Sequence, residues 1–455
     1  MSEPSGAAGA DLLALADRLV GMAQGSEQLE AYVARSSDTS VRVYEGEVEQ
    51  LSVADAQGVG VRVVVDGRQG FAYCGTFDGA ALAETVAEAR DNAAFGEPDE
   101  AAGVAVPDGV EPASLDLWRP ALAAVPTDEK VALAVQLERA VLGADPRIVG
   151  VESCDYADTL AESAVATTTG IRRASRETSC ELVAYSLAAE GDDVQTGFGF
   201  SLGRSFDELD VAVAARDAAD RALRMLGATK PPSGRLTVVL DQWVTAQLVG
   251  IVAGTLGAEE VIKGRSLFAG RVGESVASPL ITLVEDPTDA RSFGATPVDD
   301  EGLATRRLPL VTAGVLDGFA HSTWTARRLG AASTGSAVRA GFKSTPTAGC
   351  RAVTLAPGSA AAAALVAGVD DGVLVQEVSG LHSGVNPVSG DLSTGAEGLR
   401  IRGGEVAEPL REFTIASTLQ RLLHDVTAVG SDLTWLPMSA AGVTLVVGDV
   451  AVSGS

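Results

Sequence analysis

Three histidines are the first side chains to test for metal or acid–base chemistry, and their spacing favours neither. His321, His382 and His424 are separated by tens of residues. A zinc site on a helix usually has two histidines four or five residues apart, so that both imidazoles reach one ion. The predicted helix from Gln242 to Leu256 contains no histidine. The three distant histidines can still converge in space, but isolated hydrogen-bonding or surface histidines are the favoured interpretation.

Nucleophiles and paired acids give equally weak signals. No G-x-S-x-G elbow is present, and Ser393, in the segment Gly390–Gly395, is typical of a turn residue. The acids at 299–301 and 370–371 have the residue types for acid–base catalysis, but adjacent acids flanked by glycine usually form a solvated turn. Gly197–Gly203 imitates a phosphate loop, yet its alternating aromatics are typical of a strand and no Lys-Ser/Thr follows. The residues by themselves define no catalytic constellation.

Clusters of polar residues and glycine in the second half of the chain are better candidates for binding than for catalysis. Glycine lets a backbone come close to a ligand, and an exposed sheet edge accepts an extended peptide as an added strand. Hairpin turns have the same composition, and for most of these clusters a turn is the simpler interpretation. The clusters are Lys263–Ser266, Ser333–Ser336, His382–Asn386 and Gly390–Ala396.

Charge and composition narrow the range of partners. The 455 residues include 61 acidic and 34 basic ones, for a net charge of −27, and contain no basic run. Proteins that neutralise phosphates gather Lys and Arg on one face, so we expect neither nucleic acid nor membrane as a partner. The four cysteines are scattered, which predicts neither a disulfide framework nor a zinc ribbon. Met1–Gly6 has no basic start before an apolar stretch, so a cytoplasmic protein is expected.

The elements that must position these residues form a repeated pattern in the first half. Helical periodicity over residues 11–24 is followed by alternating strands and then by a helix from Asp78, which suits a capping position. The same order starts again near Thr127. Both passes end in Gly-Phe-x-aromatic, an acid and a helix that contains Ala-Arg-Asp. The pattern predicts an α+β N-terminal domain over residues 1–229, with a duplicated helix and antiparallel-sheet layout.

A linker with two prolines, Lys230–Arg235, separates this half from a region of a different kind. A strand and the helix from Gln242 come first, and many short strands follow, among them one within residues 295–302. Short strands with dense Gly and Asp turn signals favour a curved antiparallel sheet or partial barrel. We therefore predict a β-rich C-terminal domain over residues 236–455.

Several motifs, in a fixed order, make the chain similar to the TldD/PmbA family, also known as peptidase U62 or modulator of DNA gyrase. The block KGRSLFAGRVGESVASPLITLVEDP is followed by FGATPVDDEG, GVLDGFAHSTWTARRLGAASTG and VSGLHSGVNPVSGDLSTGAEGLRIRGGEV, in the family's order. EFTIASTLQRLLHDVTAVGSD closes the match. DGRQGFAYCGTFDGAALAETVAEARDNA also matches near the N-terminus, so the resemblance covers nearly the whole chain.

The family contains TldD-like zinc proteases, which carry His-Glu-x-x-x-His on the central helix and a later cysteine ligand. With the block after this helix as anchor, Val249 stands at the first histidine, Gly250 at the glutamate and Gly254 at the second histidine. No cysteine follows Cys350. None of the replacing residues can bind zinc or move a proton. The resemblance thus implies a PmbA (TldE) type of subunit, with no catalytic residue, metal or cofactor of its own.

What the resemblance implies about function is a cytoplasmic, non-catalytic subunit of a heterodimeric zinc metalloprotease. The partner would be a TldD-like subunit that holds the zinc, and the substrates would be unfolded peptides or leader peptides. A homodimer is the alternative assembly if that partner is absent, and the sequence does not decide between the two. Two alternatives stay open: a stand-alone peptide-binding or scaffold protein, and a protease with an unrecognised site. The candidates for peptide or interface contact are Arg265, Ser266, His382, Asn386, Asp391 and Ser393.

Overall fold

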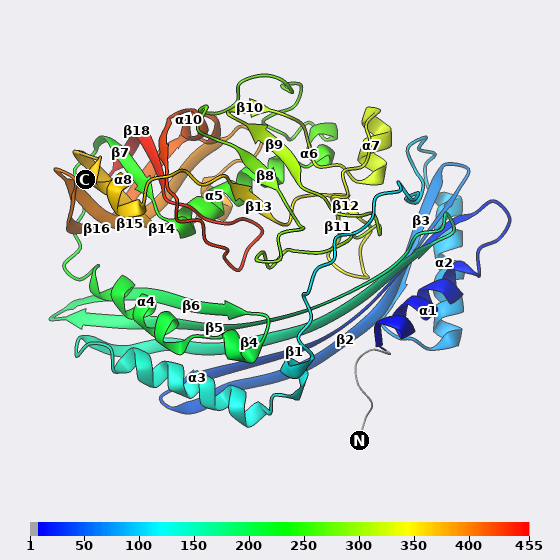
Figure 1. Cartoon of the computed structure of the whole chain (residues 1–455), viewed down its shortest axis with the longest axis horizontal. Helices are drawn as coiled ribbons and strands as arrows, with labels where there is room; N and C mark the ends of the chain where they lie inside the picture. Colours follow the sequence, from blue (N-terminus) through cyan, green and yellow to red (C-terminus); the bar gives the residue numbers. More distant parts are fainter. Residues whose placement is uncertain (1–7, 455) are drawn as a thin grey trace.

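A long, curved antiparallel sheet forms the base of the molecule, and a β-rich C-terminal region lies over its concave face (Figure 1). The structure is a computed structural model that describes residues 8–454. The segment Met1–Gly6, which bears on the signal-peptide prediction, lies outside the described residues. None of the helices described between residues 8 and 454 is both long and apolar enough to cross a bilayer.

The long sheet has six strands in the order β3-β2-β1-β4-β5-β6. Its centre is the antiparallel pair of β1 and β4, which runs from Glu30 opposite Thr167 to Val43 opposite Cys154. These two strands open the two predicted repeats, so each repeat contributes three neighbouring strands to one half of the sheet. The strands are β1 (Gln28–Tyr44), β2 (Glu47–Val65), β3 (Arg68–Cys74), β4 (Ile148–Thr167), β5 (Arg172–Glu190) and β6 (Asp193–Gly203).

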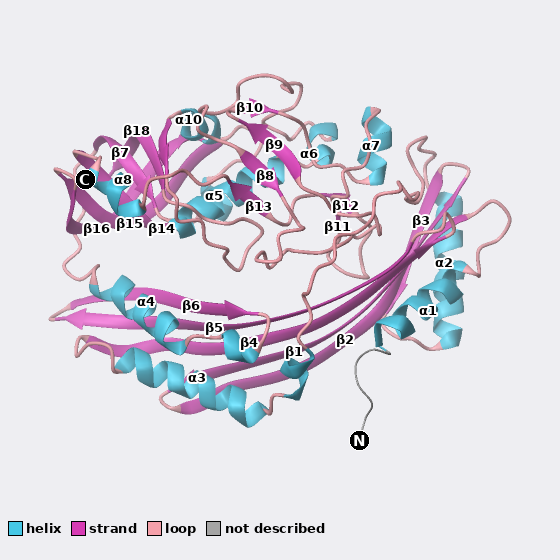
Figure 2. Cartoon of the chain, viewed as in Figure 1, coloured by secondary structure: helices cyan, strands magenta, loops and turns pink. Residues whose placement is uncertain are grey.

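Two pairs of helices cover the convex face of this sheet, one pair at each end (Figure 2). The predicted capping residue Asp78 accepts hydrogen bonds from the backbone N–H groups of Ala80 and Ala81 at 2.9 and 3.2 Å. Gly143 ends the third helix, also as predicted. The helices are α1 (Ala8–Val20), α2 (Gly79–Phe95), α3 (Thr127–Leu142) and α4 (Val211–Leu223).

The Gly-Phe-x-aromatic motif of each repeat has a packing role. A Cβ on Gly70 would lie 2.0 Å from the carbonyl oxygen of Ala89 in α2, and a Cβ on Gly197 would lie 2.4 Å from that of Ala218 in α4. Only glycine permits such a close approach of strand and helix backbones. Both repeats therefore join the last strand to the following helix in the same way, and the predicted duplication is confirmed.

The C-terminal region contains the predicted partial barrel. Strands β16-β15-β14-β7-β18 are neighbours in that order, and β16 also pairs with β18, which closes a five-stranded ring; β17 adds to its β18 side. Its strands are β7 (Gly234–Leu240), β14 (Asp371–Ser379), β15 (Asp391–Arg402), β16 (Glu405–Thr418), β17 (Val426–Val429) and β18 (Leu445–Ser453). The helices of the C-terminal region are α5 (Gln242–Thr255), α6 (Ala258–Ile262), α7 (Thr323–Leu329), α8 (Ala362–Ala367), α9 (Leu381–Gly384) and α10 (Leu419–His424).

A second, small sheet and a two-stranded ribbon lie beside the barrel, and long loops connect them. The strands of the small sheet, β10-β9-β8-β13, are short because Gly and Asp turns interrupt them. The strand predicted within residues 295–302 is wrong: this segment is a loop with a single bridge, between Val298 and Ala304. The remaining strands are β8 (Leu283–Glu285), β9 (Leu308–Thr312), β10 (Val315–Leu316), β11 (Ala337–Val338), β12 (Thr347–Ala348) and β13 (Val353–Leu355).

Candidate functional site

Helix α5 carries the positions at which the family's zinc proteases have their metal-binding motif. Val249 is buried in the core beside the barrel strands, whereas Gly254 is exposed, and a Cβ there would meet nothing within 4 Å. An isopropyl group and two glycines offer no lone pair to a metal ion. In the described part of the chain no three His, Cys, Asp or Glu side chains gather as a metal site would require. The residues present on α5 therefore do not fit zinc.

The other candidate ligands lie apart from α5 or are engaged elsewhere. His321 is largely buried, and its backbone N–H donates to Thr334 Oγ1 at 2.8 Å. His382 lies in α9 and His424 at the end of α10. Burial raises the pKa of the Cys350 thiol well above its usual value, which disfavours the thiolate that binds metals. No group of three ligands that includes these histidines occurs among residues 8–454.

Two of the predicted contact residues, Arg265 and Ser266, stabilise the loop after α6. Arg265 forms an ion pair with Glu260 at 2.7 Å. The hydroxyl of Ser266 donates to the carbonyl oxygen of Thr255, the last residue of α5, at 2.6 Å. Both side chains thus have local partners, and their contact with peptide or a partner chain stays a prediction.

The other four predicted residues come together where α9 leads into β15. Asn386 Oδ1 accepts hydrogen bonds from the backbone of the following turn, and Asn386 N–H donates to the carbonyl oxygen of Asp391 at 2.9 Å. Ser393 is exposed within β15, where it pairs with Ala416, so its assignment to a turn is wrong. His382 belongs to α9, which contacts β15. The structure accounts for Asn386 as a turn residue and for Asp391 as the first residue of β15, and the binding role of all four stays a prediction.

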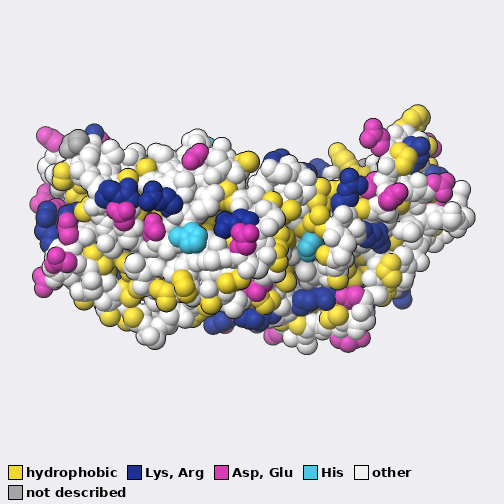
Figure 3. Space-filling model, turned by 90° about the horizontal axis from the view of Figure 1, so that it is seen from above, with side chains coloured by type: hydrophobic (Ala, Val, Ile, Leu, Met, Phe, Trp, Pro, Cys, Tyr) yellow, Lys and Arg dark blue, Asp and Glu magenta, His cyan; other side chains and the backbone are white. Residues whose placement is uncertain are grey.

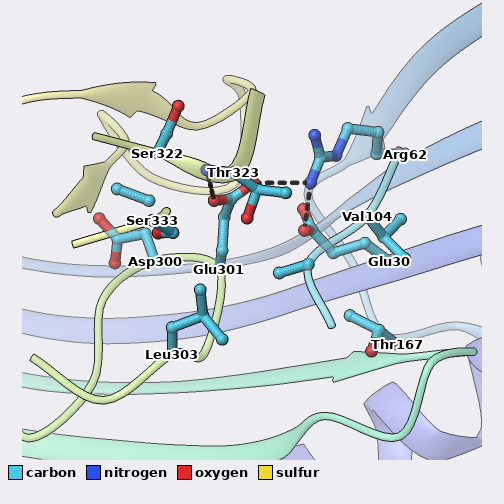
Figure 4. Close-up of polar contacts among 12 residues, drawn as sticks. Glu30, Arg62, Val104, Thr167, Asp300, Glu301, Leu303, Ser322, Thr323 and Ser333 are labelled. Atoms are coloured by element: carbon cyan, nitrogen blue, oxygen red, sulfur yellow. Dashed lines mark hydrogen bonds and ion pairs between the residues drawn. The ribbon is translucent and has the colours of Figure 1, made fainter. Parts of the chain in front are cut away.

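A buried cluster of charges joins the concave face of the long sheet to the C-terminal loops (Figure 4). Arg62, on β2, donates through Nη2 to Glu30 at 2.6 Å and to Glu301 at 3.2 Å. Arg339, from a C-terminal loop, donates to the other oxygen of Glu30 at 2.8 Å. The second oxygen of Glu301 accepts from the backbone N–H of Thr323 at 2.8 Å. The four charged side chains are no more than 4% exposed.

The prediction of a solvated acidic turn at residues 299–301 is therefore wrong for this segment. Asp299 accepts from the backbone N–H groups of Glu301, Leu303 and Ala337 at 2.9–3.0 Å, and Asp300 pairs with Arg351 at 2.7 Å. A turn sequence is the same in solvent and in an interface, and the cations that pair with these acids, Arg62 of the sheet and Arg351 of a C-terminal loop, lie far from them in the sequence. Residues 370–371 are exposed as predicted, but Asp371 is the first residue of β14 and forms an ion pair with Arg400.

The pKa values in this cluster show which charges are compensated. Burial alone would raise the pKa of Glu30, but the guanidinium groups of Arg62 and Arg339 hold it below its usual value. Burial and the nearby charge of Glu301 raise the pKa of Asp299 to about 7. Burial also raises the pKa of Glu285 to about 7, although the backbone of the Arg351 loop donates to both its oxygens. Glu30 is thus held ionised, whereas Asp299 and Glu285 titrate near neutrality.

An aromatic contact joins the two regions at the other end of the concave face. Trp243, in the first turn of α5, lies against Phe198 and Phe200 of β6, with ring centroids 4.8 and 5.5 Å apart. The guanidinium of Arg221, on α4, lies 4.4 Å from the centroid of the Phe198 ring and pairs with Asp241 at 3.2 Å. The charge cluster and this aromatic contact are thus two places, with different chemistry, at which the C-terminal region is attached to the sheet.

Between these two contacts lies a cavity of about 440 Å³. Its floor is the concave face of β1, β4 and β5, where small side chains alternate with the residues that face the helices. Its roof consists of residues 293–300 and of the loops that carry Arg339 and Arg351. Sequence reasoning did not single out this site. The feature of the sequence that could have indicated the cavity is the run of serine and alanine at alternate positions of the long strands.

Comparison with known proteins matches the whole architecture to one family. Family models described as PmbA/TldA metallopeptidase domain 1, central domain and C-terminal domain match residues 29–93, 120–226 and 233–454. Metalloprotease PmbA of Escherichia coli O157:H7 is 27% identical over 411 residues, which cover 90% of this chain and 88% of that protein. A metalloprotease TldD homolog of Haemophilus influenzae is 26% identical, with 88% of this chain and 84% of that one covered.

Solved structures show the same fold. A putative modulator of DNA gyrase from Thermotoga maritima superposes with a TM-score of 0.89 at 24% identity, over 97% of this chain and 99% of that chain. TldE from Thermococcus kodakarensis superposes with a TM-score of 0.88 at 23% identity, over 98% and 99%. The predicted family resemblance is confirmed, and the chain belongs to the PmbA/TldD family of metallopeptidases.

Proposed function

We propose that this chain is a non-catalytic subunit of a heterodimeric zinc metalloprotease that acts on unfolded peptides or leader peptides. A TldD-like partner would hold the zinc, whose bound water attacks the peptide carbonyl. This chain would complete the chamber in which the peptide lies. Its cytoplasmic location stays a prediction from the sequence.

The observation that carries the proposal is the composition of α5. The helix has the place in the fold at which a zinc protease of this family needs two imidazoles and a carboxylate, and it has Val249, Gly250 and Gly254 there. Side chains without a lone pair or an exchangeable proton cannot activate water. A chain with this helix takes part in proteolysis only through another subunit.

The surface charge agrees with a peptide substrate rather than a nucleic acid. On the face seen in Figure 3, basic and acidic side chains are interspersed, without a broad area of either sign. A protein that binds nucleic acid gathers Lys and Arg on one face. The family description as a modulator of DNA gyrase is therefore no reason to propose DNA as the ligand.

A second candidate function is a peptide-binding or scaffold protein that works without a protease partner, in solution as a monomer or homodimer. The cavity on the concave face supports this alternative, because it belongs to one chain and requires no partner to form. The third alternative, an active site built on the scattered histidines, has no support among the described residues.

The test is reconstitution with a TldD-like protein from the same organism. Each chain alone and the equimolar mixture are assayed for bound zinc by mass spectrometry and for cleavage of an unfolded peptide. We expect cleavage to require the mixture and zinc to reside in the partner. A mixture in which the motif glutamate of the partner is replaced by glutamine serves as the control and should be inactive.

Two outcomes contradict the proposal in different ways. Zinc and cleavage in this chain alone would mean that an active site exists elsewhere in it. Full activity of the partner alone, unchanged on addition of this chain, would favour the stand-alone binding protein.

A further inference from the structure

The cavity on the concave face has the size and composition of a ligand site. Ligand pockets generally enclose about 300–1,000 Å³, and this cavity of about 440 Å³ lies within that range. The charge cluster around Arg62 and the aromatic contact of Trp243 hold the sheet and the roof together on either side. The floor has Ser36, Ala161 and Ser163 where larger side chains would have filled the space. The cavity therefore lies at the interface between the long sheet and the C-terminal region.

Arg173 is the side chain that points to the charge of the ligand. It lines the cavity, and its Nη1 donates only to the backbone oxygen of Arg172 at 3.2 Å, while its Nε has no hydrogen-bond partner. No ion pair to a carboxylate is found for it in the described part of the chain. In a protein with a net charge of −27, an arginine without a carboxylate partner in an enclosed site favours an anionic ligand group.

Neighbouring donors lie on the same side. Ser175 is two residues from Arg173 on β5, so both side chains face the cavity, and the hydroxyl of Ser175 also lacks a partner. Arg339 lines the cavity from the roof, and its Nε is unpartnered although the side chain is only 1% exposed. Buried donors without acceptors cost free energy unless a ligand satisfies them. Together, these unpartnered donors suit a ligand with a carboxylate group, which accepts hydrogen bonds.

Glu177 provides the opposite charge four residues further along the same face. Its nearest cation, Arg204, is 3.9 Å away, and the Glu177 side chain is 46% exposed. Four residues of a strand span roughly 13 Å, so Arg173 and Glu177 are separated by about the length of an extended tetrapeptide. The two charges match the two ends of a short peptide with free termini.

We propose that this cavity binds a peptide of three or four residues, with its terminal carboxylate at Arg173 and Ser175 and its terminal ammonium at Glu177. The inference rests on the proposed function in peptide handling and names the ligand class of this chain's own site. A site that reads both termini selects short products of proteolysis over long chains.

The test is calorimetric titration of the full chain, without any partner, with tetra-alanine, its C-terminal amide and its N-acetyl form. We expect the free peptide to bind and each blocked form to bind at least about tenfold more weakly, because each loses one charge-assisted contact. Arg173→Gln should weaken the free peptide at least about tenfold, with little further loss for the amide. Glu177→Gln should weaken binding of the free peptide by a similar factor, with little further loss for the N-acetyl form.

The matched control is Arg172→Gln. Arg172 is the sequence neighbour of Arg173, but its side chain points to the other face of the sheet, where it pairs with Asp17 and is 60% exposed. This variant should bind like the wild type. Circular dichroism of all variants establishes that they fold, and a variant that does not is replaced by Ser175→Ala, with the same expected direction.

Absence of saturable binding of the free peptide would overturn the inference, as would equal affinity for the amide. Competition by inorganic phosphate at equal strength would also overturn it, because the site would then recognise any anion. These failures are distinct from a failure of the proposed function. Reconstituted proteolysis without peptide binding by this chain would remove the cavity site and leave the subunit role intact.

Discussion

Two of the places where the C-terminal region meets the long sheet join the same two regions with different chemistry. At one end, Arg62, Glu30, Glu301 and Arg339 form a buried cluster of alternating charge. At the other end, Trp243 packs against two phenylalanines of β6. Aromatic packing tolerates small shifts, whereas each buried charge requires a partner at hydrogen-bond distance. The charged end has four buried charges and the aromatic end the single pair of Arg221 and Asp241, so the charged end defines the relative position of the two regions more strictly.

This difference matters for the cavity, which lies between the two contacts. Arg339 belongs both to the charge cluster and to the cavity lining, and its guanidinium lies 4.4 Å from the centroid of the Tyr32 ring. Tyr32 is itself part of the cavity floor. The charge cluster thus positions one end of the candidate ligand site, and loss of this cluster should affect binding as well as stability.

The largest effect is expected for Arg62→Ala. The change leaves the carboxylates of Glu30 and Glu301 buried with one cation fewer, and breaking such a buried network usually costs about 3–5 kcal/mol. The free energy of unfolding from urea titration measures it. As the control, Arg42→Ala removes an exposed pair with Asp155 and should cost below about 1 kcal/mol. Equal losses in the two variants would mean that the buried cluster has no special role.

The pH dependence of stability should report on Glu285, a buried acid of the C-terminal region. The pKa of Glu285 is raised from 4.5 to about 7 by burial, so the folded state holds a proton that the unfolded state releases. Stability from this group is present below about pH 4 and is lost as the pH rises through about 7, by up to about 3 kcal/mol.

The variant Glu285→Gln removes this titration. Between about pH 5 and pH 8 its free energy of unfolding should fall less than that of the wild type, even though the amide satisfies fewer backbone donors and lowers stability at every pH. Glu49→Gln, at an exposed position of β2, should leave the wild-type pH profile unchanged. Parallel profiles for Glu285→Gln and the wild type would show that Glu285 stays ionised when buried.

A smaller effect is expected for Trp243→Ala at the aromatic end. The side chain is partly buried, so its removal should cost about 2–3 kcal/mol. Trp243→Phe keeps an aromatic ring and should recover more than half of the loss. A cost above that of Arg62→Ala would reverse the proposed ranking of the two contacts.

Much of the local structure was predictable from the residues. The helix capped by Asp78, the helix ended by Gly143 and the strand nature of Gly197–Gly203 depend on neighbours in the chain. The duplication was visible because both copies need glycine where a helix backbone approaches the sheet, at Gly70 and Gly197. Such requirements leave a mark in the sequence because they exclude other residue types.

The candidate sites were predictable only in part. The residues of α5 that replace the zinc motif could be identified from the order of the motifs, because the helix and the block that follows it are close in the sequence. The loop residues singled out at His382–Asn386 and Arg265 were chosen by composition, which does not separate a turn from a binding loop. No feature of the local sequence shows that Arg173 lines the cavity and Arg172 does not. The alternation of side chains along a strand predicts only that the two point to opposite faces.

The sequence alone thus determined the type and order of the elements, the duplication and the chemistry that α5 cannot perform. Tertiary structure decided which acids are buried, because Arg62 and Glu301 are 239 residues apart and Glu30 and Arg339 are 309 apart. Strand order and the docking of loops bring such pairs together, and no local pattern encodes them. An acidic turn has the same residues in water and in an interface, and its burial is favourable only because Arg62 of the sheet and Arg351 of another loop pair with its acids.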